Sequence, residues 1–254
     1  MNGNDPTIRI RGLEKCFGPL EVLRGVDLDV HSGESLVIIG PSGCGKSVLL
    51  KHMIGLIRPD AGSIRVKGEE ITEMGSESLY ELRKRFGMLF QGAALFDSLT
   101  VGENVGLGLT EHTRLSKAEI DERVMERLKM VGMGHTVDKK PSELSGGMRK
   151  RVGLARAIAM DPEIILYDEP TTGLDPIMAD VINELIRNLQ SRLNATSITV
   201  THDMISAYKV ADRIAMLHEG KIIFEGAVDE TKNSGDPVVQ QFIRGEAEGP
   251  VGTV

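Results

Sequence analysis

The sequence is poor in several features that mark whole classes of protein. It has only two cysteines, Cys16 and Cys44, which is too few for the disulfide framework of a secreted domain and indicates a reducing compartment. It has no apolar run of about 20 residues, the length that a membrane-spanning helix needs. Residues 1–6 have neither the basic region nor the apolar core of a secretory leader. We therefore expect a cytoplasmic protein with no membrane span of its own.

The chain also has fewer basic than acidic residues. The chain has 30 Lys and Arg against 37 Asp and Glu, a formal net charge of −7, which argues against a protein that coats nucleic acid. A hydrophobic fraction of 41% in 254 residues is ample for the core of one large domain. We expect a single domain over residues 1–245 and a glycine-rich tail over 246–254.

One stretch carries a strong chemical signature. Residues 35–39 form a short apolar run typical of a buried strand, and a helical pattern resumes from Lys46. Between them lies a match to G-x-x-x-x-G-K-[ST], the phosphate-binding loop, in which backbone N–H groups and a helix N-terminus face the phosphates. Lys46 can reach the β- and γ-phosphates, and the Ser47 hydroxyl can bind Mg²⁺. The candidate nucleotide-binding residues here are Gly40, Pro41, Ser42, Gly43, Cys44, Gly45, Lys46, Ser47 and Val48.

Two carboxylates follow a second apolar strand, Ile164 to Tyr167. Asp168 and Glu169 stand at its C-terminal end, where open α/β sheets bind ligands. We expect Asp168 to hold Mg²⁺ and Glu169 to orient or deprotonate an attacking water. A third apolar strand is followed by His202, which can donate to a γ-phosphate.

Two helix starts carry further polar groups. Ser145 is a good N-cap, and the poor helix formers Gly146 and Gly147 are explained either by close approach of a phosphate or by tight helix packing. The basic run that follows, residues 149–151, is interpreted as a solvated surface or as phosphate attraction. Asp175 before Pro176 is, by itself, an N-cap with proline at the first helical position.

Other segments leave two interpretations open. Phe17, at the end of the first strand, either packs in the core or stacks on adenine. The apolar residues of 92–109 are either core or a patch that binds a partner. Ser116 and Glu119 predict a capping box for a helix over 116–133, and another helix is expected over 176–193. Residues 237–245 fit one helical face, and the tail beyond them either is free or reaches across a dimer.

The whole set resembles the ATPase subunits of ABC transporters. The resemblance rests on the order and spacing of the phosphate loop, Gln91 after a strand, Leu144–Met148, Ile164–Glu169, Asp175 and His202. It implies an α/β fold of the P-loop NTPase class, with a RecA-like mixed sheet flanked by helices. It also implies an antiparallel β-subdomain on the N-terminal side and a helical subdomain over about 101–156 that carries the signature motif.

The resemblance also implies roles and cofactors. Such subunits form head-to-tail homodimers that hold two molecules of ATP with Mg²⁺, each between one phosphate loop and the partner's Ser145–Gly147. Phe17 then stacks on adenine, Gln91 binds Mg²⁺ and links it to the membrane partner, and Asp175 belongs to the nucleotide-binding set. Glu169 becomes the catalytic base and His202 the γ-phosphate contact.

One departure narrows the resemblance. The usual signature ends in Gln, whereas this chain has Met148. Together with Phe90–Leu99, this is similar to the ATPases of MCE-linked, Mla-type phospholipid transporters, which maintain outer-membrane lipid asymmetry in Gram-negative bacteria. The implied partners are an integral membrane permease, a small cytoplasmic regulatory subunit and a periplasmic MCE protein, with the ATPase on the cytoplasmic face of the inner membrane.

Three other functions stay open at this point. The first is the ATPase of an ABC importer for a polar solute. The second is a soluble ABC protein of DNA repair or translation, which would need a fused second ATPase domain, a long coiled coil or a zinc insertion. The third is a nucleotide-binding module without catalysis, against which Glu169 argues.

Overall fold

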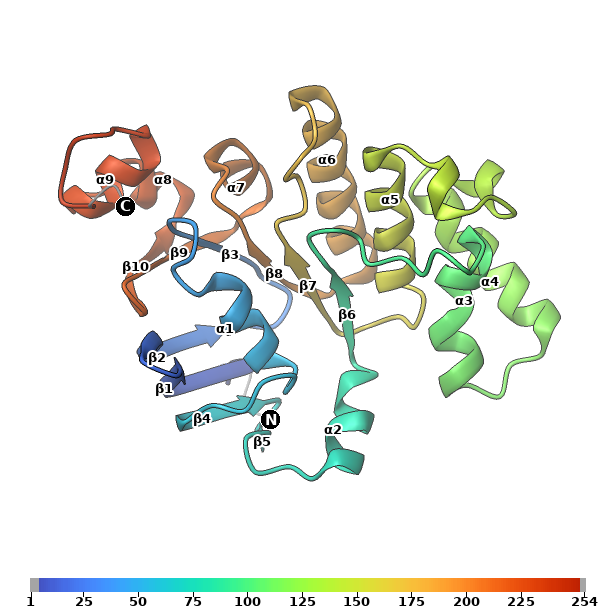
Figure 1. The fold of residues 1–254 in the computed structure, drawn as a ribbon, viewed down its shortest axis with the longest axis horizontal. Helices are drawn as coiled ribbons and strands as arrows, with labels where there is room; N and C mark the ends of the chain where they lie inside the picture. Colours follow the sequence, from blue (N-terminus) through green and yellow to red (C-terminus); the bar gives the residue numbers. More distant parts are fainter. Residues whose placement is uncertain (1–4, 252–254) are drawn as a thin grey trace. The chain divides into compact units, whose positions relative to one another are not determined.

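The computed structural model describes residues 5–251, so expectations on residues 1–4 and 252–254 lie outside the described part. The chain divides into two compact units, one of residues 1–79 with 198–254 and one of residues 80–197. Helix α2 (Ser76–Arg83) carries the chain from the first unit into the second, and strand β8 (Thr196–Val200) carries it back (Figure 1). The predicted extents of domain and tail stay predictions.

The first unit contains a four-stranded antiparallel sheet. Its strands are β1 (Ile8–Phe17), β2 (Leu20–Val30), β4 (Ala61–Val66) and β5 (Glu69–Glu70), in the order β2-β1-β4-β5. Ile8 pairs with Val30 on one side and with Val66 on the other, and all three side chains are buried. Alternate residues of the strands thus form one apolar face. This sheet is the antiparallel β-subdomain that the sequence predicted.

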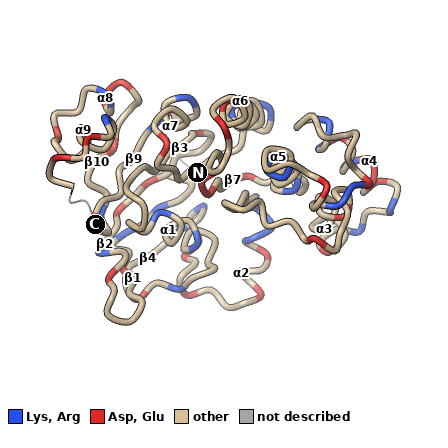
Figure 2. The backbone as a smooth tube through the Cα atoms, turned by 45° about the horizontal axis from the view of Figure 1, so that its top comes forward, with Lys and Arg blue, Asp and Glu red and all other residues tan. Residues whose placement is uncertain are grey.

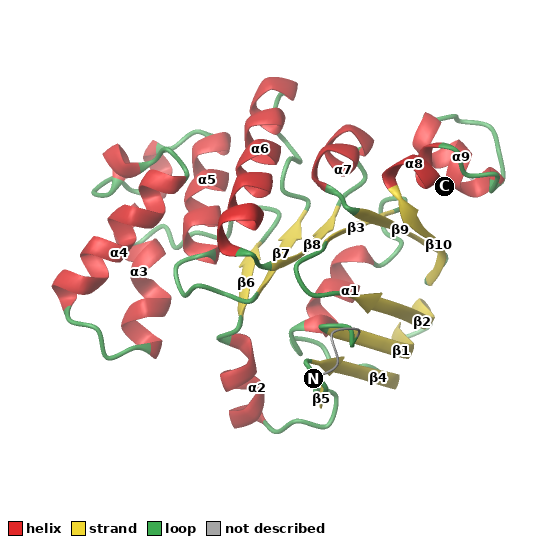
Figure 3. Ribbon diagram, turned by 180° about the vertical axis from the view of Figure 1, so that it is seen from behind, coloured by secondary structure: helices red, strands yellow, loops and turns green. Residues whose placement is uncertain are grey.

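The same unit contains parallel and antiparallel pairing side by side. Strand β3 (Ser35–Ile39) pairs in parallel with β9 (Arg213–His218), which forms a hairpin with β10 (Lys221–Ala227). Glu219 and Gly220 connect the hairpin with φ of 46° and 75°, the left-handed conformation of a tight primed turn. The unit's remaining helices are α1 (Lys46–Met53), α7 (Met204–Val210), α8 (Val228–Lys232) and α9 (Pro237–Arg244) (Figure 3).

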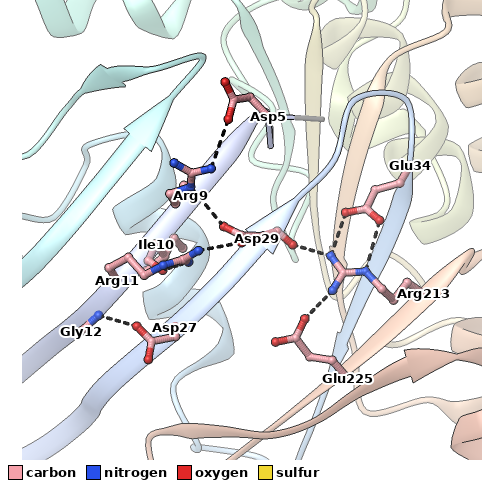
Figure 4. A network of polar contacts seen from close by, with 10 residues as sticks. All are labelled: Asp5, Arg9, Ile10, Arg11, Gly12, Asp27, Asp29, Glu34, Arg213 and Glu225. Carbon is pink, nitrogen blue, oxygen red and sulfur yellow. Dashed lines mark hydrogen bonds and ion pairs between the residues drawn. The ribbon is translucent and has the colours of Figure 1, made fainter. Parts of the chain in front are cut away.

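A polar network joins strands of this first unit (Figure 4). The guanidinium of Arg213 donates to both carboxylate oxygens of Glu34, at 3.2 and 2.9 Å, to the carboxylate of Glu225 and to the carbonyl of Asp29. The Asp29 carboxylate in turn accepts from Arg11 at 2.7 Å. Burial raises the pKa of Glu225 even though Arg213 opposes the shift. Because one fork-shaped cation binds groups from β2, β10 and the turn before β3, it fixes their spacing.

The second unit contains a short pair of parallel strands and a set of helices. Strand β6 (Phe86–Leu89) pairs with β7 (Ile164–Asp168) from Phe86↔Ile164 to Leu89↔Tyr167. The helices are α3 (Val101–His112), α4 (Lys117–Met130), α5 (Gly146–Ala157) and α6 (Pro176–Leu193), with 3₁₀ turns at Gly134–Thr136 and Pro141–Glu143. Charges of both signs follow each other along α4 (Figure 2), as expected of a solvated helix face.

The predicted elements agree with the structure. The strands expected at 35–39 and at 164–167 are β3 and β7, and every residue of both strands is buried. The capping box predicted for Ser116 and Glu119 is formed at the start of α4. Mixed pairing with flanking helices is the predicted α/β class. No helix within residues 5–251 has the length and apolar character of a membrane span.

Candidate functional site

The phosphate loop lies in the first unit between β3 and α1. Gly40, Gly43 and Gly45 all have positive φ, at 150°, 82° and 105°. A Cβ atom on Gly40 would lie 2.1 Å from the carbonyl oxygen of Leu217, so any other residue there would displace the loop. Helix α1 begins without a side-chain cap and without an acidic residue in its first turn. Its N-terminus is therefore electrostatically suited to an anion.

Lys46 lies folded back over this loop. Its ammonium group donates to the carbonyl of Gly40 at 2.7 Å and to that of Pro41 at 3.0 Å, and the side chain is buried. These two carbonyls hold the cation against the backbone of the loop. Six residues further on, Nδ1 of His52 donates to the Val48 carbonyl at 2.8 Å, and burial lowers the pKa of His52.

Two other predicted site residues belong to the first unit. Phe17 ends β1 with 47% of its surface exposed, so the interpretation as a core residue is wrong, and the ring is free to offer a face to a base. Lys15 Nζ lies 5.5 Å from its centroid. His202 follows β8 and lines a cavity of about 350 Å³ with Pro41 and Ser42, so the structure does bring this histidine to the phosphate loop.

The C-terminal segment closes the other side of that cavity. The side chain of Gln241, on α9, is buried and donates to the carbonyls of Glu246 and Val251, both at 3.2 Å, while its oxygen accepts from the Val251 N–H at 2.6 Å. Residues 246–251 are therefore held against their own helix, although their composition suggested a segment that does not order itself.

The carboxylate pair lies in the second unit at the end of β7. Asp168 and Glu169 are 6% and 8% exposed. Glu169 has φ of 48°, a left-handed conformation that costs a non-glycine residue about 1–3 kcal/mol. The hydroxyl of Thr172 donates to Glu169 Oε2 at 2.9 Å, which orients the carboxylate. A buried, oriented carboxylate at a strand end suits a group that must activate water.

Both predicted helix starts are confirmed. The Ser145 hydroxyl accepts from the N–H of Met148 at 3.3 Å, and Asp175 accepts from the N–H groups of Ile177 and Met178, both at 3.0 Å. Rigid packing explains neither of the signature glycines. A Cβ on Gly147 would lie 2.6 Å from Met178 Cε, the far end of a flexible side chain that can shift, whereas a Cβ on Gly146 would meet only Leu174 Cδ2, at 3.8 Å. Gly146 is thus open to a ligand.

Sequence reasoning missed Lys150, in the basic run at 149–151. The prediction of a solvated or phosphate-facing run is wrong for this residue: it is 5% exposed and donates to the carbonyl of Glu169 at 3.0 Å and to that of Gln91. Its place on α5 contained the signal, since Lys150 is three residues from Gly147 and four from Leu154, on the buried helix face. Burial lowers the pKa of Lys150, while Asp168 and Glu169 oppose the shift.

Gln91 itself lies two residues beyond β6 with its side chain exposed. Ala94 and Phe96, just after it, line a cavity of about 650 Å³ in the second unit, together with Tyr80, Phe86, Met88 and Met160. Phe96 is 53% exposed, whereas Ala93, Val101 and Val105 are buried. The core interpretation is therefore confirmed for the buried set, whereas binding of a partner at the exposed Phe96 stays a prediction.

Known proteins are similar to this chain in sequence and in fold. A family model described as ABC transporter matches residues 23–172. A protein of Mycobacterium leprae, described as a probable ribonucleotide transport ATP-binding protein, is 45% identical over 96% of this chain and 71% of its own length. The intermembrane phospholipid transport system ATP-binding protein MlaF of Haemophilus influenzae is 42% identical over 98% of this chain and 94% of its own.

A solved structure is also similar to this chain in fold. An ATP-binding cassette, determined as a dimer in a post-hydrolysis state with ADP and phosphate, superimposes with a TM-score of 0.81. It is 33% identical to this chain and covers 87% of it and 98% of the cassette. The predicted P-loop NTPase fold is confirmed.

Proposed function

This chain belongs to the ABC transporter family and is an ATPase of that family, and from this premise we propose that it drives phospholipid movement between the inner and outer membranes. The observation that carries the proposal is the end-to-end match with MlaF, which covers 98% of this chain and 94% of that relative. The Met148 signature supports it. We propose an MCE-type system with a separate integral membrane permease, a periplasmic MCE protein and a small cytoplasmic regulatory subunit.

Each unit contributes separate groups to the proposed ATP cycle. From the first unit, residues 40–48 bind the phosphates, Phe17 stacks on adenine and His202 contacts the γ-phosphate. From the second, Glu169 takes a proton from the attacking water. The Thr172 hydroxyl holds the Glu169 carboxylate in place. Gly146 and Ser145 offer N–H groups and a hydroxyl to the nucleotide of a second copy, and Asp175 belongs to the same nucleotide-binding set.

Mg²⁺ fits the donor atoms that these residues supply. Ser47 offers a hydroxyl, Gln91 an amide oxygen and Asp168 a carboxylate, and Mg²⁺ prefers such oxygen ligands. When bound, the ion neutralises negative charge on the β- and γ-phosphates.

The proposed function also requires a homodimer and binding to the permease. The dimeric cassette supports a homodimer, because Ser145–Gly147 would contact a nucleotide held by another subunit. The cavity beside Ala94 and Phe96, whose lining surface is mainly apolar, suits a short helix of the permease. We propose that the subunit lies at the cytoplasmic face of the inner membrane, attached through its partners.

The first experiment tests the chemistry. Glu169→Gln removes the base but leaves Lys46 and Ser47, so we expect kcat to fall by about 10²- to 10⁴-fold while ATP binding stays within about twofold. The variant should accumulate as an ATP-bound dimer, measured by size-exclusion chromatography with light scattering. Glu122→Gln, an exposed carboxylate on α4, is the control. Hydrolysis by Glu169→Gln at the wild-type rate would refute the assignment.

A second function has one observation in its favour. The relative with 45% identity is described as a probable ribonucleotide transport protein, which supports the alternative of a polar solute. Mass spectrometry of the gently solubilised native complex separates the two, since it identifies the permease and its bound cargo together. We expect phospholipid, and a ribonucleotide in its place would favour the alternative.

A further inference from the structure

Lys150 is a cation enclosed by the second unit. Its neighbours in the basic run have different surroundings: Arg149 is exposed and donates to the carbonyl of Leu144 at 3.0 Å, and Arg151 is only partly buried. A buried ammonium group loses its hydration, so such a residue is unfavourable unless the protein replaces the lost contacts. A methionine would fill nearly the same space without this cost. The positive charge of Lys150 therefore needs an explanation beyond packing.

The partners of Lys150 supply one. Its ammonium group donates to the backbone carbonyls of Gln91 and Glu169. Strands β6 and β7 are paired in parallel up to Leu89↔Tyr167, and continuing this register by two residues aligns Gln91 with Glu169. Lys150 thus bridges the two chains just beyond the point where their ladder of backbone hydrogen bonds ends. Charge-assisted bonds from one cation take the place of the missing ladder.

The bridge acts on a residue in an unfavourable conformation. Glu169 adopts φ of 48°, and a non-glycine residue keeps such a backbone only when its surroundings hold it there. Its carbonyl accepts from Lys150 and from the Thr172 N–H, and its carboxylate accepts from the Thr172 hydroxyl. Loss of the Lys150 contact would let the backbone relax and turn the carboxylate away from the water that it activates.

Lys150 also belongs to the helix that carries the signature motif. It stands one turn after Ser145 and Gly146 on α5, so a displacement of this helix start moves the ammonium group with it. We propose that Lys150 is a positioning residue for hydrolysis, which fixes the backbones of Gln91 and Glu169 and couples the signature end of α5 to the catalytic carboxylate of the same subunit. The proposal rests on the proposed function, in which Glu169 is the base.

The test compares variants of the full-length chain in steady-state ATP hydrolysis and in binding of a fluorescent ATP analogue. Lys150→Met keeps the shape and removes the donor, so we expect kcat to fall by about 10- to 100-fold while KM and analogue affinity stay within about twofold. Lys150→Arg, which retains paired donors, should recover part of kcat. Lys117→Met, at an exposed position of α4, is the matched control.

A double variant shows whether the effect passes through Glu169. If Lys150 positions this carboxylate, Lys150→Met should add no further loss to the residual rate of Glu169→Gln, because groups that act as one unit are not additive. If the rate losses of the two single variants instead multiply in the double variant, the proposal is overturned. A folded Lys150→Met protein with wild-type kcat, or one with raised KM and unchanged kcat, would also overturn it.

Failure of this inference is distinguishable from failure of the proposed function. Full activity of Lys150→Met together with an inactive Glu169→Gln would reject the positioning role alone. Full activity of Glu169→Gln would reject the base itself. Should Lys150→Met not fold, as judged by thermal melting, the comparison uses Lys150→Gln, and a folded variant with unchanged kcat at this position rejects the role.

Discussion

His52 shows how one buried side chain can make the nucleotide-binding unit sensitive to acid. It is fully buried on α1, the helix that starts at Lys46, and burial is the main cause that lowers its pKa below the ordinary value of 6.5. The folded protein therefore keeps the ring neutral at a pH where the unfolded chain already binds a proton. Its contribution to stability is present above pH 6.5 and is lost as the pH falls through the lowered value.

Melting temperatures measured between pH 7.5 and 5.5 test the direction of this pH effect on stability. We expect the wild type to lose stability more steeply between pH 7.5 and 5.5 than His52→Asn, which keeps a donor for the Val48 carbonyl but cannot become charged. His31→Asn, at an exposed position, should leave the steepness of the wild type unchanged. Equal slopes for wild type and His52→Asn would show that this ring is not the group that titrates.

Single residues also show where sequence reasoning succeeds and where it ends. Gly40, Asp168 and Asp175 were predictable because their roles depend on local backbone: a left-handed turn, a strand end and a helix cap. Phe17 and Lys150 were not, because exposure and burial are decided by elements distant in sequence. An aromatic residue at the end of a strand suits a core or a surface, and only the fold leaves Phe17 47% exposed.

At the scale of elements, helix α3 is the main omission of the sequence analysis. Its start has a complete capping box, in which the Thr100 hydroxyl accepts from the Glu103 N–H at 3.1 Å. Three glycines in the helix nevertheless argue against it, because glycine is a poor helix former. Tertiary packing explains two of them. A Cβ on Gly102 would lie 2.8 Å from Val137 Cγ2, and one on Gly106 would lie 3.1 Å from Val124 Cγ2.

Helix α3 contributes Leu107 and Gly108 to the lining of the cavity beside Phe96. Phe96 lines it and is half exposed, whereas Leu95 does not line it, so a charge at Phe96 is the sharper probe of docking. Burying such a side chain contributes about 1.5–3 kcal/mol, so Phe96→Asp should weaken capture of the permease by about 10- to 100-fold. Its melting temperature should stay close to that of the wild type.

The control for this docking surface is an apolar side chain of similar exposure elsewhere. Leu56 is 49% exposed and lies outside this cavity, in the first unit. Leu56→Asp should capture the permease as the wild type does in the same pull-down. A stable Phe96→Asp protein with normal capture would contradict the docking role of this cavity.

At the scale of the whole molecule, the question is whether the C-terminal segment binds its own subunit or tethers two subunits to each other. Within residues 5–251, the tail is held in its own subunit, because both ends of the buried Gln241 amide are used by Glu246 and Val251. A tether across a dimer would have to give up these bonds first. The cavity that the tail closes also contains Ser42 and His202, so the segment lies beside the phosphate loop of its own chain.

Deleting residues 246–254 should therefore lower stability without weakening the dimer. The deletion removes the three hydrogen bonds between the Gln241 amide and residues 246 and 251, each of which contributes about 0.5–1.5 kcal/mol, so the melting temperature should fall by several degrees for a chain of this size. Dimer dissociation constants without nucleotide, measured by sedimentation at matched salt, should agree for full-length and truncated protein. A weaker truncated dimer with an unchanged melting temperature would instead establish the tether, because a tether acts by raising effective concentration and its loss leaves the fold of each subunit intact.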